Sequence, residues 1–164
     1  MIQTTHFTPA IEDFRRRFLT SCRPPRIRTM EEFARQEVVL PDGPYEGHKF
    51  RADRQPYAGL WLHQASLDQY KFNVSTGPVQ SGKTLLCCVI PAMFYLFERN
   101  ETIIFGLPTM DMSADKWRED LRPAIEASKY RRLLPKTGPG SREGTGNLSA
   151  VKFRNGATLK FMSG

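Results

Sequence analysis

The sequence predicts an α/β protein, in which an incomplete parallel sheet is flanked by helices. Three observations support this class. Between residues 70 and 127 the pattern runs strand, helix, strand, helix, which is typical of parallel sheets. A glycine-rich motif joins the first of these strands to its helix. Near the C-terminus two alternating segments flank an Asn-Gly pair, which predicts a β-hairpin.

Composition excludes several classes of protein. The chain has 164 residues, of which 40% are hydrophobic and 25% charged, so it can bury a core and is not a disordered polymer. The longest apolar run, 85–97, is too short to span a membrane and contains Pro91. The N-terminus lacks a signal-peptide pattern, so we expect no export. Cys22, Cys87 and Cys88 offer neither a disulfide framework nor metal-ligand spacing, which indicates a reducing cytosol.

The positive charge is concentrated at the C-terminal end. The net charge of +7 comes from 24 basic and 17 acidic residues. Residues 1–127 contain equal numbers of the two, whereas residues 128–164 contain eight basic residues and only Glu143 as an acid. This asymmetry predicts a polyanionic partner. The alternative is an acidic neighbouring segment or subunit that covers the basic region.

The first part of the chain reads as a helical arm with a linker, residues 1–48. Apolar residues at 11, 14, 18 and 19 predict one helix, with Arg15, Arg16 and Arg17 beside its apolar face. Pro24 and Pro25 then interrupt the chain. Thr29 and Glu32 form a capping-box pattern for a second helix that runs to about residue 39. Residues 41–47 are rich in turn formers, and we place a second domain at 49–164.

The second part alternates strands and helices. Residues 70–75 predict a strand, and 85–97 predict a buried helix that is apolar on every side, kinked or shortened by Pro91. We expect Cys87 and Cys88 to pack in the core there. Residues 101–106 predict a second strand, and Asp111 is expected to cap the helix that follows it. That helix has an apolar face of Trp117, Leu121, Ala124 and Ile125, with Asp115/Arg118 and Glu119/Arg122 as exposed pairs.

The last segment predicts a hairpin after a glycine-rich loop at 137–147. Residues 151–161 alternate on either side of Asn155-Gly156, and this pair favours a two-residue type I′ turn. One face of the hairpin then carries Val151, Phe153, Leu159 and Phe161, and the other carries Lys152, Arg154 and Lys160.

A phosphate-binding loop is the most specific motif in the chain. It matches G-x-x-x-x-G-K-[ST] over Gly77, Pro78, Val79, Gln80, Ser81, Gly82, Lys83 and Thr84. Glycines let backbone N–H groups turn inward toward phosphate oxygens, and the helix that follows adds the positive end of its dipole. Lys83 would neutralise the outer phosphates of ATP, and the Thr84 hydroxyl would be a ligand of Mg²⁺.

Weaker signals surround this loop. Gln55, followed by Pro56-Tyr57, is a candidate to read an adenine edge; the alternative is a turn that packs on the core. Residues 107–109 either present a loop to nucleic acid or form a plain strand-to-helix turn. Double-stranded DNA could contact the basic side chains of the C-terminal region, or these could simply protect a solvated edge hairpin. The candidate DNA contacts are Arg142, Lys152, Arg154 and Lys160.

Over residues 30–164 the chain resembles the ATPase half of phage terminase large subunits, nearest to the lambda-like group. The resemblance rests on Phe33, on 37–44, on Gln55-Pro56 before the loop at 77–84, and on the later 107–109 and Asn155-Gly156. It implies a P-loop NTPase-like fold, with Gly77, Gly82, Lys83 and Thr84 at Walker A positions and Gln55 at the adenine position. Terminase loops often carry an arginine, whereas 79–81 here read Val-Gln-Ser.

The family implies an ATP-driven motor that packages double-stranded DNA into procapsids in the bacterial host cytoplasm. Its partners are a portal, a small terminase subunit and further copies in a ring, with no membrane. The acidic Walker B strand and a nuclease are not found in this sequence, so we expect an N-terminal segment that does not turn over ATP alone. Two alternatives stay open: a DNA-binding or assembly module with a relic loop, and part of another helicase-like ATPase.

Overall fold

The computed structural model describes residues 9–22, 26–67, 69–135 and 149–164. It is a mixed α/β structure with a small three-stranded sheet in the order β1-β3-β2. Strand β1 (Ile103–Leu107) pairs in parallel with β3 (Thr158–Ser163), whereas β2 (Ala150–Lys152) pairs with β3 in the antiparallel sense. The predicted α/β class is therefore confirmed, with a sheet that is mixed rather than all parallel.

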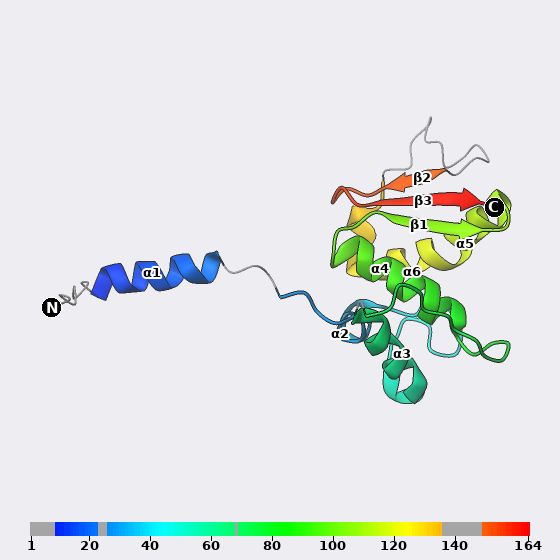
Figure 1. Cartoon of the computed structure of the whole chain (residues 1–164), viewed down its shortest axis with the longest axis horizontal. Helices are drawn as coiled ribbons and strands as arrows, with labels where there is room; N and C mark the ends of the chain where they lie inside the picture. The colour runs from blue at the N-terminus through cyan, green and yellow to red at the C-terminus, as the bar shows by residue number, and fades with distance from the viewer. Residues whose placement is uncertain (1–8, 23–25, 68, 136–148) are drawn as a thin grey trace.

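Helices cover one face of this sheet (Figure 1). The covered face includes Leu159 and Phe161, which are 0% and 5% exposed, and Phe161 lies edge-on to Phe105 of β1. The opposite face carries Ile104 and Met162, which are 60% and 53% exposed. Because side chains alternate along a strand, the predicted division of the C-terminal hairpin into an apolar and a basic face is confirmed.

Two short helices pack beneath this layer, α2 (Met30–Glu37) and α3 (Pro56–Ser66). The predicted capping box is present: the Thr29 hydroxyl accepts from the Glu32 N–H, and the Glu32 carboxylate accepts from the Thr29 N–H. Phe33 of α2 is fully buried and meets Phe94 edge-on at 5.6 Å between ring centres. Thus α2 shares one core with later elements, and the domain boundary at 48 remains a prediction.

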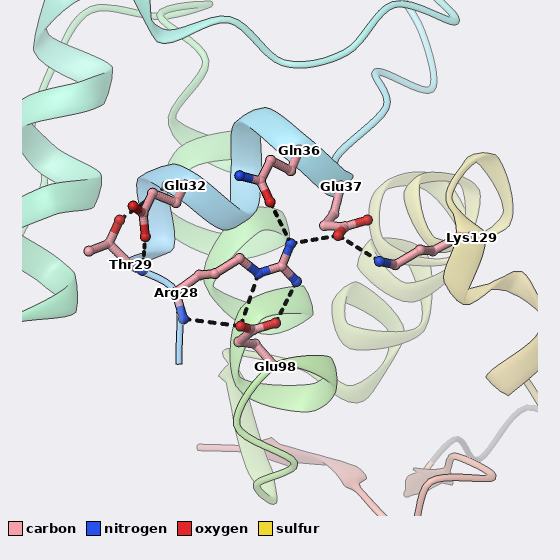
Figure 2. Close-up of polar contacts among 7 residues, drawn as sticks. All are labelled: Arg28, Thr29, Glu32, Gln36, Glu37, Glu98 and Lys129. Carbon is pink, nitrogen blue, oxygen red and sulfur yellow. Dashed lines mark hydrogen bonds and ion pairs between the residues drawn. The ribbon is translucent and has the colours of Figure 1, made fainter. Parts of the chain in front are cut away.

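An ion-pair cluster also joins α2 to the rest of the structure (Figure 2). Arg28 contacts Glu98 at the end of α4 and Glu37 at the end of α2, and Glu37 also accepts from Lys129. The earlier helix α1 (Pro9–Ser21) exposes its apolar side, with Phe14 and Phe18 at 69% and 58% exposure.

The helix after the glycine-rich loop has two parts. Leu85–Val89 is π-helical, and α4 (Ile90–Phe97) continues as a regular α-helix. Pro91 lacks an N–H group for the preceding turn, and the Ile90 N–H donates to the Leu85 carbonyl five residues back. The helix is not shortened at Pro91, because it continues to Phe97; its irregularity is the π-helical turn, and the expected kink stays a prediction. The expectation that the helix is buried on every side is wrong for Cys87, which is exposed.

The second long helical segment also has a π-helical turn just before a proline. It consists of α5 (Met110–Lys116), a π-helical turn (Trp117–Leu121) and α6 (Arg122–Ala127), with Pro123 in the first turn of α6. Its predicted apolar face is buried. A short 3₁₀ helix (Lys129–Leu133) follows, and another (Ala52–Arg54) precedes α3.

Two details of that segment correct the sequence-based expectation. Thr109, not Asp111, is the N-cap of α5, because its hydroxyl accepts from the Met112 N–H. Arg122 pairs with Glu126 at 2.9 Å rather than with Glu119. Glu119 and Glu126 both lie at helical spacing from Arg122, three residues before it and four residues after it. In the structure Arg122 contacts Glu126.

The hairpin turn also differs from the expected type I′ geometry. The Gly156 N–H donates to the Phe153 carbonyl at 3.0 Å, so Arg154 and Asn155 are the central residues of the turn. Gly156 alone in this turn has a positive φ, of 92°. This is a type I-like turn followed by a left-handed glycine, a pattern that keeps the strand pairing with a bulge.

The predicted strand at 70–75 does not form. The segment lies outside the helices and strands of the structure, and Phe72 and Val74 are 86% and 82% exposed. An alternating pattern is not sufficient for a strand, because a strand also requires a hydrogen-bonded neighbour. None of the described helices is long and apolar enough to cross a membrane.

Candidate functional site

The loop at 77–84 connects the irregular segment at 70–75 to the π-helical turn that precedes α4. The first helical turn begins at Lys83, and the Leu86 N–H donates to the Gly82 carbonyl at 3.0 Å. Gly82 has φ of 77° and Gln80 has φ of 59°, so the backbone curls twice in the left-handed region before the helix starts. The motif therefore sits at a helix N-terminus, as its chemistry requires.

The Lys83 ammonium group is held by the loop's own oxygen atoms. It donates to the carbonyl oxygen of Gly77 at 2.9 Å, to that of Pro78, and to the Ser81 hydroxyl at 3.3 Å. These are the contacts of a cation turned into the loop rather than toward bulk solvent. A phosphate oxygen could replace them one for one, because each is an oxygen acceptor on the same ammonium group.

The two motif glycines stand where a side chain would be strained or crowded. A Cβ at Gly77 would lie 3.3 Å from the Ser81 hydroxyl oxygen, closer than ordinary van der Waals contact. At Gly82 the positive φ already disfavours other residues. A Cβ there would also lie 3.5 Å from Oε1 of Gln55, which places this candidate adenine reader against the loop.

Backbone donors are also available in the curl. In the described part of the chain, the N–H groups of Val79, Gln80, Ser81 and Gly82 donate to no backbone carbonyl. Thr84 is partly buried in the first turn of the helix. The residues present therefore fit a phosphate group: backbone N–H donors, one ammonium group and a hydroxyl placed one residue after it. Thr84 is the residue that would hold Mg²⁺.

Tyr57 ties α3 to this loop. Its hydroxyl donates to the Ser81 carbonyl at 2.8 Å, from the first turn of α3. Pro56 occupies the first helical position, where its missing N–H carries no cost, so the Gln55-Pro56-Tyr57 pattern starts a helix beside the loop. The Ala58 N–H donates to the Gln55 carbonyl at 2.8 Å, which fixes the turn.

A cavity of about 620 Å³ lies between α3 and the loop. The α3 side contributes Tyr57, Leu60, Trp61 and Gln64, and the loop side contributes residues 74–78, Ser81, Lys83 and Leu86. Sequence reasoning did not identify Leu60, Trp61 or Gln64. The feature of the sequence that could have identified them is their spacing of three, four and seven residues from Tyr57, which places all four on one helix face.

The candidate DNA contacts lie elsewhere. Lys152 and Lys160 are exposed on neighbouring strands of the open sheet face, and Arg154 is exposed in the turn. Arg142 lies outside the described residues. Residues 107–109 form a strand-to-helix turn beside a groove of about 430 Å³ at the carboxyl ends of β1 and β3. Neither place brings these residues into the loop at 77–84.

Among the described residues, no three His, Cys, Asp or Glu side chains gather as a metal site would require. No protein-family model matches the chain, and neither do the curated proteins or the solved structures compared with it.

Proposed function

We propose that residues 77–84 bind the phosphates of a nucleoside triphosphate with Mg²⁺, and that the chain is the N-terminal ATP-binding segment of a viral DNA-packaging terminase large subunit with a P-loop NTPase-like fold. One observation carries the nucleotide-binding part. Lys83 turns into a curled glycine loop at a helix N-terminus, where its three acceptors are oxygen atoms of the loop.

The position of each residue in the loop indicates the contact that it makes with the nucleotide. The Lys83 ammonium exchanges the Gly77 and Pro78 carbonyls for oxygens of the outer phosphates. The N–H groups of residues 79–82 bind the negative charge together with the helix dipole. The Thr84 hydroxyl would be the protein ligand of Mg²⁺. Bound ATP would supply the phosphoryl group whose transfer drives a motor.

The motor role rests on the resemblance to terminases. In that role the segment works with double-stranded DNA, a portal, a small terminase subunit and other copies in a ring. We propose nucleotide binding for this segment and assign turnover to the complete motor, because the residues named above account for binding only.

Thermal unfolding with Mg-ATP and Mg-ADP tests the proposal. A ligand that binds only the folded chain stabilises it by RT ln(1 + [L]/Kd), so the melting temperature rises with the logarithm of ligand concentration once that concentration exceeds Kd. We expect wild type to be stabilised, and Lys83→Ala to raise Kd at least about tenfold through loss of one charged contact. Lys71→Ala is the control, since it removes the same charge from an exposed position outside the loop.

Two outcomes would contradict nucleotide binding at this loop. One is a wild-type chain that neither ligand stabilises. The other is equal stabilisation of wild type and Lys83→Ala. Urea unfolding of Lys83→Ala without ligand shows whether the variant is folded, so a loss of binding can be separated from a loss of structure.

A second function, DNA binding by the basic sheet face, is favoured by the exposure of Lys152 and Lys160 on adjacent strands. Such contacts to phosphates release counterions, so binding must weaken with salt, and each lost contact lowers the salt slope by about one. We expect Arg154→Ala and Lys160→Ala to weaken binding to duplex DNA, with Lys83→Ala and Lys49→Ala unaffected. Salt-independent binding, or none, would exclude this function.

A further inference from the structure

One face of α3 is an apolar stripe that ends in an amide. Tyr57, Leu60, Trp61 and Gln64 follow one another at helical spacing, and all four line the cavity beside the loop. Leu60 is 64% exposed and Tyr57 is 51% exposed. Trp61 is partly buried and packs against the core. The stripe therefore presents two aromatic rings and a leucine to the cavity.

The opposite wall belongs to the loop itself. Val74, Pro78 and Leu86 add further apolar surface, and Lys83 and Ser81 add polar atoms. A volume of about 620 Å³ lies within the range of small-molecule sites, which combine apolar walls with a few placed polar groups. Lys83 of the loop and Trp61 of α3 line the same cavity, so one ligand bound there could contact both.

We propose that this cavity binds the heteroaromatic base of a nucleotide, with the ring against Trp61 and Tyr57, and that Gln64 reads the edge of the base. This inference rests on the proposed function, since the loop must hold the phosphates. In this arrangement α3 selects the ligand, and it selects a planar, hydrogen-bonding ring rather than a bare polyphosphate.

The position of Gln64 fits this task. Tyr57 holds the loop through Ser81, and Gln64 lies seven residues further along α3, which is about 10 Å along a helix axis. In the proposed complex, this distance along α3 separates the phosphate end of the nucleotide from its base end. An amide can donate one N–H to N7 of adenine and accept from the N6 amino group with its carbonyl oxygen, whereas guanine presents two acceptors at the corresponding edge. We therefore expect ATP to bind more tightly than GTP.

Gln55, the residue that the sequence favoured for this role, has a different environment. Its amide lies near Gly82, with Oε1 at 3.5 Å and Nε2 at 4.0 Å from the position of a Cβ there. Gln55 is also absent from the lining of the cavity. In this arrangement Gln55 lies beside Gly82 of the loop, outside the residues that line the proposed base site.

Tryptophan fluorescence tests the inference directly. The chain has two tryptophans, and Trp117 is buried at 3% exposure between Phe153 and Phe161, so Trp61 is the reporter for the cavity. We expect Mg-ATP to quench the emission by stacking, and inorganic tripolyphosphate with Mg²⁺ to bind without quenching. Trp61→Phe should abolish the quenching while ATP still raises the melting temperature.

Substitution of the amide tests selection. Gln64→Leu should raise the Kd for Mg-ATP about tenfold, bring it within about twofold of that for Mg-GTP, and leave tripolyphosphate binding unchanged. Gln69→Leu, outside the cavity, is the matched control. Urea unfolding of each variant without ligand establishes that it is folded.

The possible failures are distinct. If tripolyphosphate and ATP bind equally and neither quenches Trp61, the base site is wrong and the phosphate loop stands. If Gln64→Leu keeps the wild-type preference for ATP over GTP, Gln64 does not select the base. If neither ATP nor tripolyphosphate stabilises the wild-type chain, the proposed function fails, and the inference fails with it.

Discussion

Arg28 and Glu98, which are 70 positions apart in the sequence, form a two-pronged ion pair. The guanidinium donates from Nε to Oε1 at 3.0 Å and from Nη2 to Oε2 at 2.5 Å, and the Arg28 backbone N–H also donates to Oε1 (Figure 2). Both side chains are largely buried, at 23% and 13% exposure. The pair fastens the segment before α2 to the C-terminal end of the helix that follows the loop.

Removing this guanidinium should destabilise the fold. In Arg28→Ala the carboxylates of Glu98 and Glu37 remain largely buried while Glu98 loses its partner, and we expect a loss of about 2 to 3 kcal/mol in the free energy of unfolding. Arg28→Lys should recover only part, because an ammonium cannot make the forked contact. Urea unfolding measures both variants.

An exposed ion pair supplies the control. Arg51 contacts Asp53 with side-chain exposures of 61% and 55%, so Arg51→Ala should leave stability nearly unchanged. Equal losses of unfolding free energy in Arg28→Ala and Arg51→Ala would show that the buried ion pair stabilises the fold no more than the exposed pair does.

The same pair should make stability depend on pH. Hydrogen bonding from Arg28 holds the pKa of Glu98 below its ordinary value of 4.5. A carboxyl group with a lowered pKa in the folded state adds stability that is complete above the unfolded pKa and is lost as pH falls through the folded pKa. The difference in unfolding free energy between wild type and Glu98→Gln should therefore be constant near neutrality and shrink below pH 4.5.

Urea unfolding of the two proteins across this range gives that difference, in which the titration of groups outside the cluster cancels. A difference that stays constant from neutral to acidic pH would contradict the role of Glu98. Glu37 lies in the same cluster, where burial raises its pKa but its bonds to Lys129 and Arg28 produce a net lowering. Glu37→Gln should show the same sign of pH dependence.

Local patterns in the sequence predicted the elements whose causes are local. The capping box at Thr29 and Glu32 spans four residues and is present in the structure. The apolar run at 85–97 is helical throughout, with a π-helical turn before Pro91. The alternation in the hairpin placed Val151 and Phe161 on the buried face. In each case the information needed lies within one turn or one strand pair.

Expectations failed where the outcome depends on distant partners. Residues 70–75 alternate like a strand, yet pairing requires a free neighbouring strand, which a local pattern does not specify. Cys87 lies in a run that is apolar all round, so only the arrangement of covering helices decides that it is exposed. The contact of Gln64 with the cavity depends on where α3 lies relative to the loop.

The hairpin turn gives a test of backbone strain alone. Gly156 has φ of 92°, and nothing lies within 4 Å of a Cβ added there, so Gly156→Ala creates no clash. We expect a loss of about 1 kcal/mol in the free energy of unfolding, because an alanine disfavours the left-handed region. Gly106→Ala in β1 is the control: it has equal space and no positive φ, and its stability should not fall. Similar losses at both positions would contradict the turn geometry.

Adjacent cysteines in the helix after the loop should differ sharply in reactivity. Burial raises the pKa of the Cys88 thiol to about 12, and the nearby Asp120 carboxylate acts in the same direction. Cys87 is exposed at the next position. Because the thiolate is the nucleophile, alkylation by iodoacetamide at pH 8 should modify Cys87 at least about tenfold faster than Cys88 in the folded chain.

Mass spectrometry of the peptides from a Cys88→Ser and a Cys87→Ser variant assigns each rate. The two rates should converge in concentrated urea, where burial no longer distinguishes the thiols. Equal rates in the folded chain would mean that the helix does not present Cys87 to solvent and Cys88 to the core.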